Sequence, residues 1–132
     1  MEINPKKILL LAKKHKLKLL ILFGSQAQGG THVGSDVDLA FFPREKIDTE
    51  RLREDLMRLF KRADLDLIDI SATHNHLLRY QIMRHGKVLY EESVGLKSKW
   101  EGQSYIDYMD FKCYYEMRSK LLSEKIEAMA HG

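Results

Sequence analysis

The chain has 132 residues, of which 44% are hydrophobic and 31% charged, and its formal net charge is +3. This length suits one compact domain, and the composition is that of a globular protein rather than a disordered one. The charge does not by itself predict nucleic-acid binding, and no apolar run approaches a membrane span. The single cysteine, Cys113, excludes an internal disulfide framework and is typical of a reducing compartment. We expect one cytoplasmic domain, residues 1–132, without a signal peptide or membrane contact.

Lysines are concentrated at the N-terminus, and two interpretations of them are open. We favour a solvated helix face. A surface for ATP phosphates, RNA or an acidic partner is the alternative. The six lysines are Lys6, Lys7, Lys13, Lys14, Lys16 and Lys18.

The first half of the chain predicts a helix followed by two strands. Asn4-Pro5 is a favourable helix start, with a capping side chain before a proline at the first helical position. The nearly continuous apolar run Leu17–Phe23 indicates a strand buried on both faces. Residues 26–35 are polar and glycine-rich, so the chain leaves the sheet there. Asp36–Phe42 predicts the second strand, which the following proline ends.

The second half alternates helices and strands. A helix begins at Asp48 or Thr49, and a third strand covers Leu65–Ile70. Another helix begins at Thr73 or Asn75 and ends at Gly86, and Lys87–Tyr90 is a short last strand. This alternation predicts an α/β architecture around a short sheet.

The pattern changes after Glu92 and divides the chain into a core, residues 1–92, and a C-terminal segment, residues 93–132. We expect a loop over Ser93–Ser104 and one long helix over Tyr105–Met129. An apolar stripe at three- and four-residue spacing indicates that this helix packs on something. The stripe consists of Ile106, Met109, Cys113, Met117 and Leu121.

The clearest functional signal is Gly24-Ser25, followed after ten residues by Asp36-Val37-Asp38. Glycine at the end of a buried strand lets backbone amides approach a phosphate, and Ser25 adds a hydroxyl donor. Asp36 and Asp38 lie two apart on a strand, so their carboxylates project from the same face. Paired carboxylates repel unless a cation bridges them, and their hard oxygens suit magnesium or manganese held jointly with substrate phosphates. The alternative is a glycine turn beside two aspartates that merely face water.

A third carboxylate is needed to complete a two-metal site, and the third strand offers three. Asp66 lies within the strand and is our preferred ligand. Asp64 lies at the mouth of the strand and is the fallback, whereas Asp69 projects to the face opposite Asp66.

These segments resemble the signature of minimal nucleotidyltransferases, a family of the DNA polymerase β-like superfamily. The resemblance rests on Leu22–Ala27 and Ser35–Leu39, continues through Asp66–Asp69 and Gly86–Glu91, and covers residues 1–92 best. It implies a polymerase β-like core, a short mixed sheet with flanking helices, to which this chain adds the long C-terminal helix. It also implies ATP as substrate, on Gly24 and Ser25, and two Mg²⁺ ions, held by Asp36, Asp38 and Asp66.

The C-terminal stretch Tyr108–Lys112 is similar to one in MntA-type antitoxins of HEPN/MNT toxin–antitoxin systems. This resemblance implies transfer of AMP to a tyrosine hydroxyl of a partner HEPN RNase toxin, in a possible hetero-oligomer with that toxin. In relatives an arginine or lysine often follows within the Gly-Ser turn, whereas Gln26 and Gln28 stand here. The basic residues that contact the triphosphate are therefore not identified.

We expect an adenylyltransferase that acts as antitoxin without binding nucleic acid directly. A transferase for a small molecule or an RNA end, and a non-catalytic toxin-binding antitoxin, are the alternatives. Arg79 and His85 have the sequence spacing of the arginine–histidine pair of HEPN RNases. That pair belongs to an all-helical fold, so we interpret both residues as surface residues of a helix.

Overall fold

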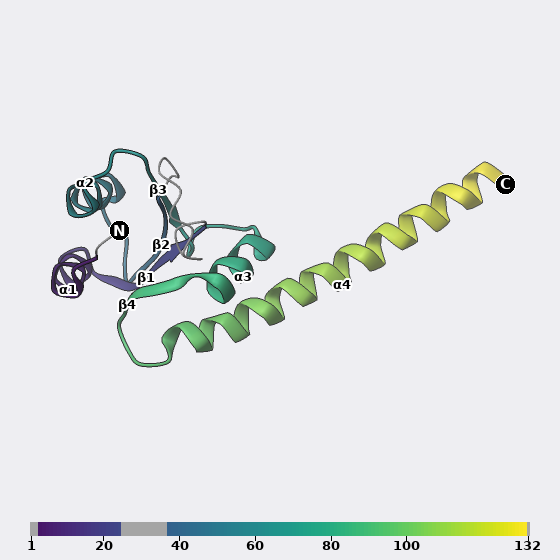
Figure 1. Cartoon of the computed structure of the whole chain (residues 1–132). Helices are drawn as coiled ribbons and strands as arrows, with labels where there is room; N and C mark the ends of the chain where they lie inside the picture. Colours follow the sequence, from purple (N-terminus) through teal and green to yellow (C-terminus); the bar gives the residue numbers. More distant parts are fainter. Residues whose placement is uncertain (1–2, 25–36, 132) are drawn as a thin grey trace.

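A four-stranded sheet with helices on both faces forms the body of the protein, and the last helix projects far beyond it (Figure 1). The computed structural model describes residues 3–24 and 37–131. Its elements in chain order are α1 (Pro5–Lys14), β1 (Leu17–Phe23), β2 (Val37–Pro43), α2 (Thr49–Phe60), β3 (Leu65–Asp69), α3 (His76–His85), β4 (Lys87–Glu91) and α4 (Leu96–His131).

The sheet is mixed, as expected, with strand order β3-β2-β1-β4. β1 is antiparallel to both β2 and β4, whereas β2 and β3 are parallel. A parallel pair needs a crossover connection, which α2 supplies. The parallel pairing brings the beginnings of β2 and β3 to the same edge of the sheet, where β1 ends.

Alternate residues of the strands pack into two separate cores. On one face α1 and α2 cover Leu20, Leu39 and Phe41, and on the other α3 and α4 cover Leu19 and Ile21. Because β1 contributes to both cores, its run of leucine and isoleucine is buried almost throughout. This double burial confirms the prediction for that strand.

Capping side chains fix the helix starts predicted from the sequence. Asn4 Oδ1 accepts hydrogen bonds from the amides of Lys6 and Lys7 at the start of α1. Asp48 caps α2 and Asn75 caps α3 in the same way. Each cap satisfies amides that have no partner within the helix.

The helix α3 ends at Gly86 for a reason that the sequence did not indicate. Gly86 has an extended backbone (φ −71°, ψ 151°), not the left-handed one expected of a glycine after a helix. A Cβ at this position would overlap Ile21 Cγ2 and the carbonyl oxygen of Ile82. Close contact between α3 and β1 therefore requires the glycine.

The loop expected over Ser93–Ser104 is wrong, because α4 already begins at Leu96. The ring of Trp100 lies 4.2 Å from that of Phe42, centroid to centroid, and Ser104 is 5% exposed. Gly102 and the polar residues around it are typical of a loop, so the sequence does not predict a helix here. The first turns of α4 are stabilised by tertiary packing. None of the helices in the described part of the chain is both long and apolar enough to cross a membrane.

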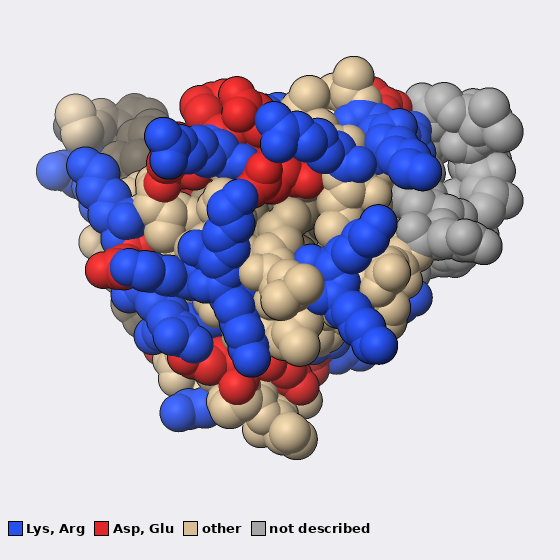
Figure 2. All heavy atoms as spheres, turned by 90° about the vertical axis from the view of Figure 1, so that its left-hand side faces the viewer, with Lys and Arg blue, Asp and Glu red and all other residues tan. Residues whose placement is uncertain are grey.

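The outer face of α1 and α2 carries many lysines and arginines with acidic side chains among them (Figure 2). Lys14 Nζ lies 3.0 Å from Asp55 Oδ2, and Lys16 Nζ lies 2.7 Å from Glu45 Oε1. These pairs support the interpretation of the N-terminal lysines as a solvated face. The α1–α2 layer lies on the opposite side of the sheet from α3, so the lysines of α1 do not line the α3 face.

Asp55 joins the two helices of this layer and gives a prediction about acid stability. His15 Nε2 donates a hydrogen bond to Asp55 Oδ2 at 2.6 Å, and this bond and the one from Lys14 hold the pKa of Asp55 below its usual value. A carboxyl whose pKa is lowered by folding stabilises the fold above its unfolded pKa of about 3.9, and this stabilisation disappears as the pH falls through the lower, folded-state pKa.

We therefore expect Asp55→Asn to lower the free energy of unfolding by about 1–2 kcal/mol at pH 7, and by progressively less as the pH falls below about 3.9. Urea unfolding across this pH range measures the difference. Glu54→Gln, a change at the exposed neighbouring residue, serves as the control. Equal effects of the two substitutions at pH 7 would contradict the role of Asp55.

Candidate active site

Three chain segments meet at the edge of the sheet where β1 ends and where β2 and β3 begin. Asp38 pairs in register with Phe23 on one side and with Asp66 on the other. Neighbouring strands lie about 4.8 Å apart, so the two carboxylates project side by side from the same face of the sheet. This is the face that α3 and α4 cover farther along the strands.

Gly24, directly after β1, lies against Asp38. Its φ of +77° favours glycine, and a Cβ built there would overlap Asp38 Oδ2 and lie 3.3 Å from Asp38 Cγ. Glycine is required here both by its backbone conformation and by the approach of the carboxylate. Gly24 and Asp38 are thus in direct contact, as expected if both bind the same ligand.

The two other acidic residues of the third strand have different surroundings from Asp66. Arg62 Nε and Nη2 donate to the Asp64 carboxylate at 2.9 and 2.6 Å, and the guanidinium holds the pKa of Asp64 below its usual value. Asp69 accepts from the amide and hydroxyl of Ser71 at 2.9 and 2.5 Å and projects from the other face. Asp66, exposed and beside Asp38, is the carboxylate best placed to share a cation with it.

Two of the predicted site residues, Ser25 and Asp36, lie outside the described residues. Asp36 directly precedes β2, two positions before Asp38. Within residues 3–24 and 37–131, no three histidine, cysteine, aspartate or glutamate side chains gather closely enough to form a metal cluster. Asp38 and Asp66 therefore supply a pair of carboxylates, and a third one stays a prediction.

A groove of about 320 Å³ adjoins this edge on the α3 side. Its lining comes from the end of β1 and from one face of α3: Phe23, Gly24, Leu78, Gln81, Ile82 and His85. The predicted site contains no residue of α3. The spacing of these residues was visible in the sequence, but their position beside Gly24 depends on how α3 packs on β1.

The interpretation of Arg79 as a surface residue of a helix holds only in part. Arg79 is half-buried, donates a hydrogen bond to the carbonyl oxygen of Thr73 at 2.6 Å, and lines a second cavity of about 230 Å³ with Trp100. His85 is exposed, as expected. Arg79 lines the second cavity and His85 lines the groove beside Gly24, so the two residues do not form a shared site.

Comparison with known proteins identifies the family to which the chain belongs. Residues 6–94 match the family described as polymerase beta, nucleotidyltransferase. The chain is 32% identical over 93 residues to the protein adenylyltransferase MntA of Shewanella oneidensis, a match covering 67% of this chain and 66% of that protein. It is 36% identical over 104 residues to MntA of Aphanizomenon flos-aquae, covering 69% and 68%. The chain belongs to the MntA-type nucleotidyltransferases. The matches span about two thirds of the length of these relatives.

Solved structures support the fold of this nucleotidyltransferase. A chain in the crystal structure of a toxin–antitoxin with AMP-PNP has a TM-score of 0.72 and 26% identity, covering 86% of this chain and 94% of that one. A chain in the structure of a tri-AMPylated Shewanella oneidensis HEPN toxin in complex with an MNT antitoxin has a TM-score of 0.65 at 23% identity, covering 86% and 90%. These likenesses confirm the polymerase β-like core with a long C-terminal helix.

Gly24 offers a test of the site geometry, because Gly95 provides a matched control. Both glycines have positive φ, +77° and +85°, but a Cβ on Gly95 would meet nothing within 4 Å. We expect Gly95→Ala to cost about 1 kcal/mol of stability, from backbone strain alone. Gly24→Ala adds the displacement of Asp38 and costs about 1–3 kcal/mol. Urea unfolding measures both.

The two variants also differ in ligand binding. Gly24→Ala should lose the thermal stabilisation by Mg²⁺-ATP, and Gly95→Ala should keep it, because only the former moves Asp38. Retention of that stabilisation in Gly24→Ala would show that the turn is not part of the site.

Proposed function

We propose that this protein is a Mg²⁺-dependent adenylyltransferase that transfers AMP from ATP to a tyrosine hydroxyl of a partner HEPN toxin, and that it thereby acts as an antitoxin. The observation that carries the proposal is the in-register pair Asp38 and Asp66, with Gly24 against Asp38 at the same edge of the sheet. The relatives named protein adenylyltransferase support the reaction. The structures of a toxin–antitoxin with AMP-PNP and of an AMPylated HEPN toxin support the substrate and the partner.

The residues present fit a magnesium site. Magnesium prefers carboxylate oxygens and is commonly held by one or two carboxylates together with substrate phosphates. Asp38 and Asp66 provide these oxygens on adjacent strands, and Asp36 is proposed as the further ligand. When bound, magnesium neutralises charge on the attacking and departing oxygens.

The chain itself positions the reactants. Backbone amides at Gly24, with the Ser25 hydroxyl, are proposed to hold the triphosphate, because a turn without a Cβ permits close approach of phosphate oxygens. The acceptor hydroxyl lies on the Asp66 side, where the carboxylate orients it and accepts its proton. The hydroxyl oxygen forms a bond to the α-phosphorus, the bond from that phosphorus to the bridging oxygen breaks, and pyrophosphate leaves.

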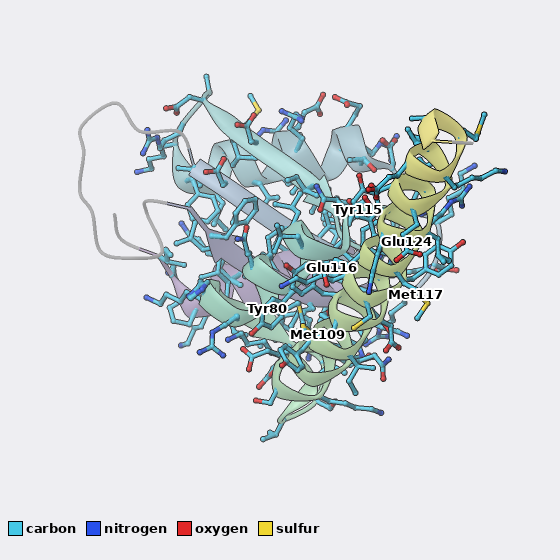
Figure 3. The ribbon with its side chains drawn as sticks, turned by 90° about the vertical axis from the view of Figure 1, so that its right-hand side faces the viewer. Tyr80, Met109, Tyr115, Glu116, Met117 and Glu124 are labelled. Atoms are coloured by element: carbon cyan, nitrogen blue, oxygen red, sulfur yellow. The ribbon has the colours of Figure 1, made fainter. Side chains whose placement is uncertain are left out.

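The projecting half of α4 supports a helical protein partner. The ring of Phe111 still lies 5.2 Å from that of His76 on α3, centroid to centroid. Residues 112–130 are all exposed, and at a rise of about 1.5 Å per residue they extend the helix roughly 28 Å beyond this contact. Figure 3 shows Tyr115, Met117 and Glu124 on this part of α4, whereas Tyr80 and Met109 lie where α4 crosses α3. The stripe that faces the body at Trp100, Ser104 and Phe111 continues along the projecting part as Tyr115, Leu122, Ile126 and Met129.

An unpaired helix with such a stripe gains stability when other helices cover it. A HEPN toxin, which is all-helical, offers such helices. We therefore assign the contact with the toxin to this half of α4.

The first test of the proposal is Asp66→Asn with a co-expressed candidate HEPN toxin. Loss of the carboxylate that orients the acceptor should lower AMP transfer by about 10²–10⁴. Binding of Mg²⁺-ATP should fall much less, since Gly24 and Asp38 remain. The intact mass of the toxin measures transfer, and thermal stabilisation measures nucleotide binding.

Asp64→Asn and Asp69→Asn are the matched controls. Both change a carboxylate of the same chain segment, but one is held by Arg62 and the other by Ser71 on the opposite face, so both should retain transfer. Normal transfer by Asp66→Asn together with loss in Asp64→Asn would reassign the third ligand. A parent protein that adds no AMP to any toxin would refute the proposed function.

A second test concerns α4. Leu122→Glu with Ile126→Glu introduces charge into the exposed stripe without touching the body. We expect an unchanged free energy of unfolding and at least tenfold weaker association with the toxin, because burying two unpaired carboxylates in an apolar contact costs more than the roughly 1.4 kcal/mol that a tenfold change represents. Glu116→Gln with Glu124→Gln, on the polar face, is the control. Equal association of both double variants would exclude the stripe as the contact.

A further inference from the structure

The groove between β1 and α3 shares only Gly24 with the proposed metal and phosphate site, and it adjoins that site directly. Its α3 side consists of residues at positions 78, 81, 82 and 85, a spacing that places them on one face of the helix. Its other side is Phe23 and Gly24 at the end of β1. At about 320 Å³ the groove falls within the range of small-molecule sites.

The order of the strands assigns this groove to the nucleotide rather than to the acceptor. Along the edge of the sheet Asp66 of β3 comes first, then Asp38 of β2, then Gly24 after β1. In the proposed reaction the acceptor hydroxyl lies at Asp66, and the triphosphate lies at Gly24. The groove lies on the Gly24 side, next to the bound nucleotide.

The lining of the groove suits a base better than a phosphate. Phe23, Leu78 and Ile82 are apolar, and the phosphates are already accounted for by the turn. An aromatic ring beside an aliphatic wall is a typical surface for a flat base, and stacking on it contributes to binding of any nucleobase. Selection of one base then requires a polar group in the same groove.

Gln81 is that group, and we propose that the groove binds the adenine base of ATP with the Gln81 amide hydrogen-bonded to its polar edge. This inference rests on the proposed adenylyl transfer. The Gln81 side chain is exposed, and within the described ranges it makes no side-chain hydrogen bond. Its carbonyl accepts from the adenine amino group while its NH₂ donates to a ring nitrogen, the pairing that glutamine commonly makes with adenine. On the edge that carries N1, guanine presents O6 and N1–H in the places of the adenine amino group and N1, so it pairs only with the reversed orientation of the amide.

The chemistry of the pairing predicts a change of base preference in Gln81→Glu. A carboxylate has no donor for the adenine ring nitrogen, but it accepts two hydrogen bonds from guanine. We expect the affinity for Mg²⁺-ATP to fall about 10- to 100-fold, and that for Mg²⁺-GTP to rise. Gln81→Ala should weaken Mg²⁺-ATP about tenfold without a gain for GTP. Titration calorimetry on the full chain, with unchanged melting temperatures, measures each affinity.

Mg²⁺-tripolyphosphate separates the base from the phosphates. Its affinity should be the same in the parent, in Gln81→Glu and in Gln81→Ala, and weaker than that of ATP in the parent. Gln103→Glu, the same chemical change on α4 outside the groove, should keep the parent preference for ATP.

Two results would overturn the assignment of the groove to adenine without contradicting the proposed function. One is equal affinity of the parent for Mg²⁺-ATP and Mg²⁺-tripolyphosphate. The other is a ratio of ATP affinity to GTP affinity that Gln81→Glu leaves unchanged. A parent that binds neither compound contradicts the proposed function as well. The outcomes are therefore distinguishable.

Discussion

The parallel, in-register pairing of β2 with β3 is the constraint on which the site depends. It places Asp38 beside Asp66, although the two residues are far apart in the chain and are separated by α2. A shift of one residue in this register would turn one carboxylate to the opposite face of the sheet. The buried residues on either side, Leu39 and Leu65, oppose such a shift, because it would expose them. Packing of the α1–α2 core thus fixes the geometry of the carboxylates.

The sequence predicted the elements of the core well, because local signals mark them. Helix starts are indicated by the capping residues Asn4, Asp48 and Asn75, and a strand is indicated by the apolar run of β1. The first turns of α4 were missed because Trp100 is held by Phe42 from β2, a contact that no local pattern reveals.

The candidate site was predictable where it depends on strand periodicity and not where it depends on packing. Strand periodicity places Asp69 on the face opposite Asp66 and so excludes it as a ligand. It places Asp64 on the same face as Asp66, so Asp64 remained an alternative ligand. Its ion pair with Arg62, two residues away, distinguishes it. The groove beside Gly24 could not be predicted, because it requires the position of α3 against β1, which the missing Cβ of Gly86 permits.

The strand order also determines when the functional parts become available during synthesis. Domains form as the chain emerges, beginning from the N-terminus. The carboxylate pair needs the chain only as far as β3, and the groove needs it as far as α3, whereas the exposed half of α4 is synthesised after both. A nascent chain that presents this half of α4 to another protein therefore already contains every residue of the site. Premature termination within α4 would remove the surface proposed for the toxin and spare the proposed site residues.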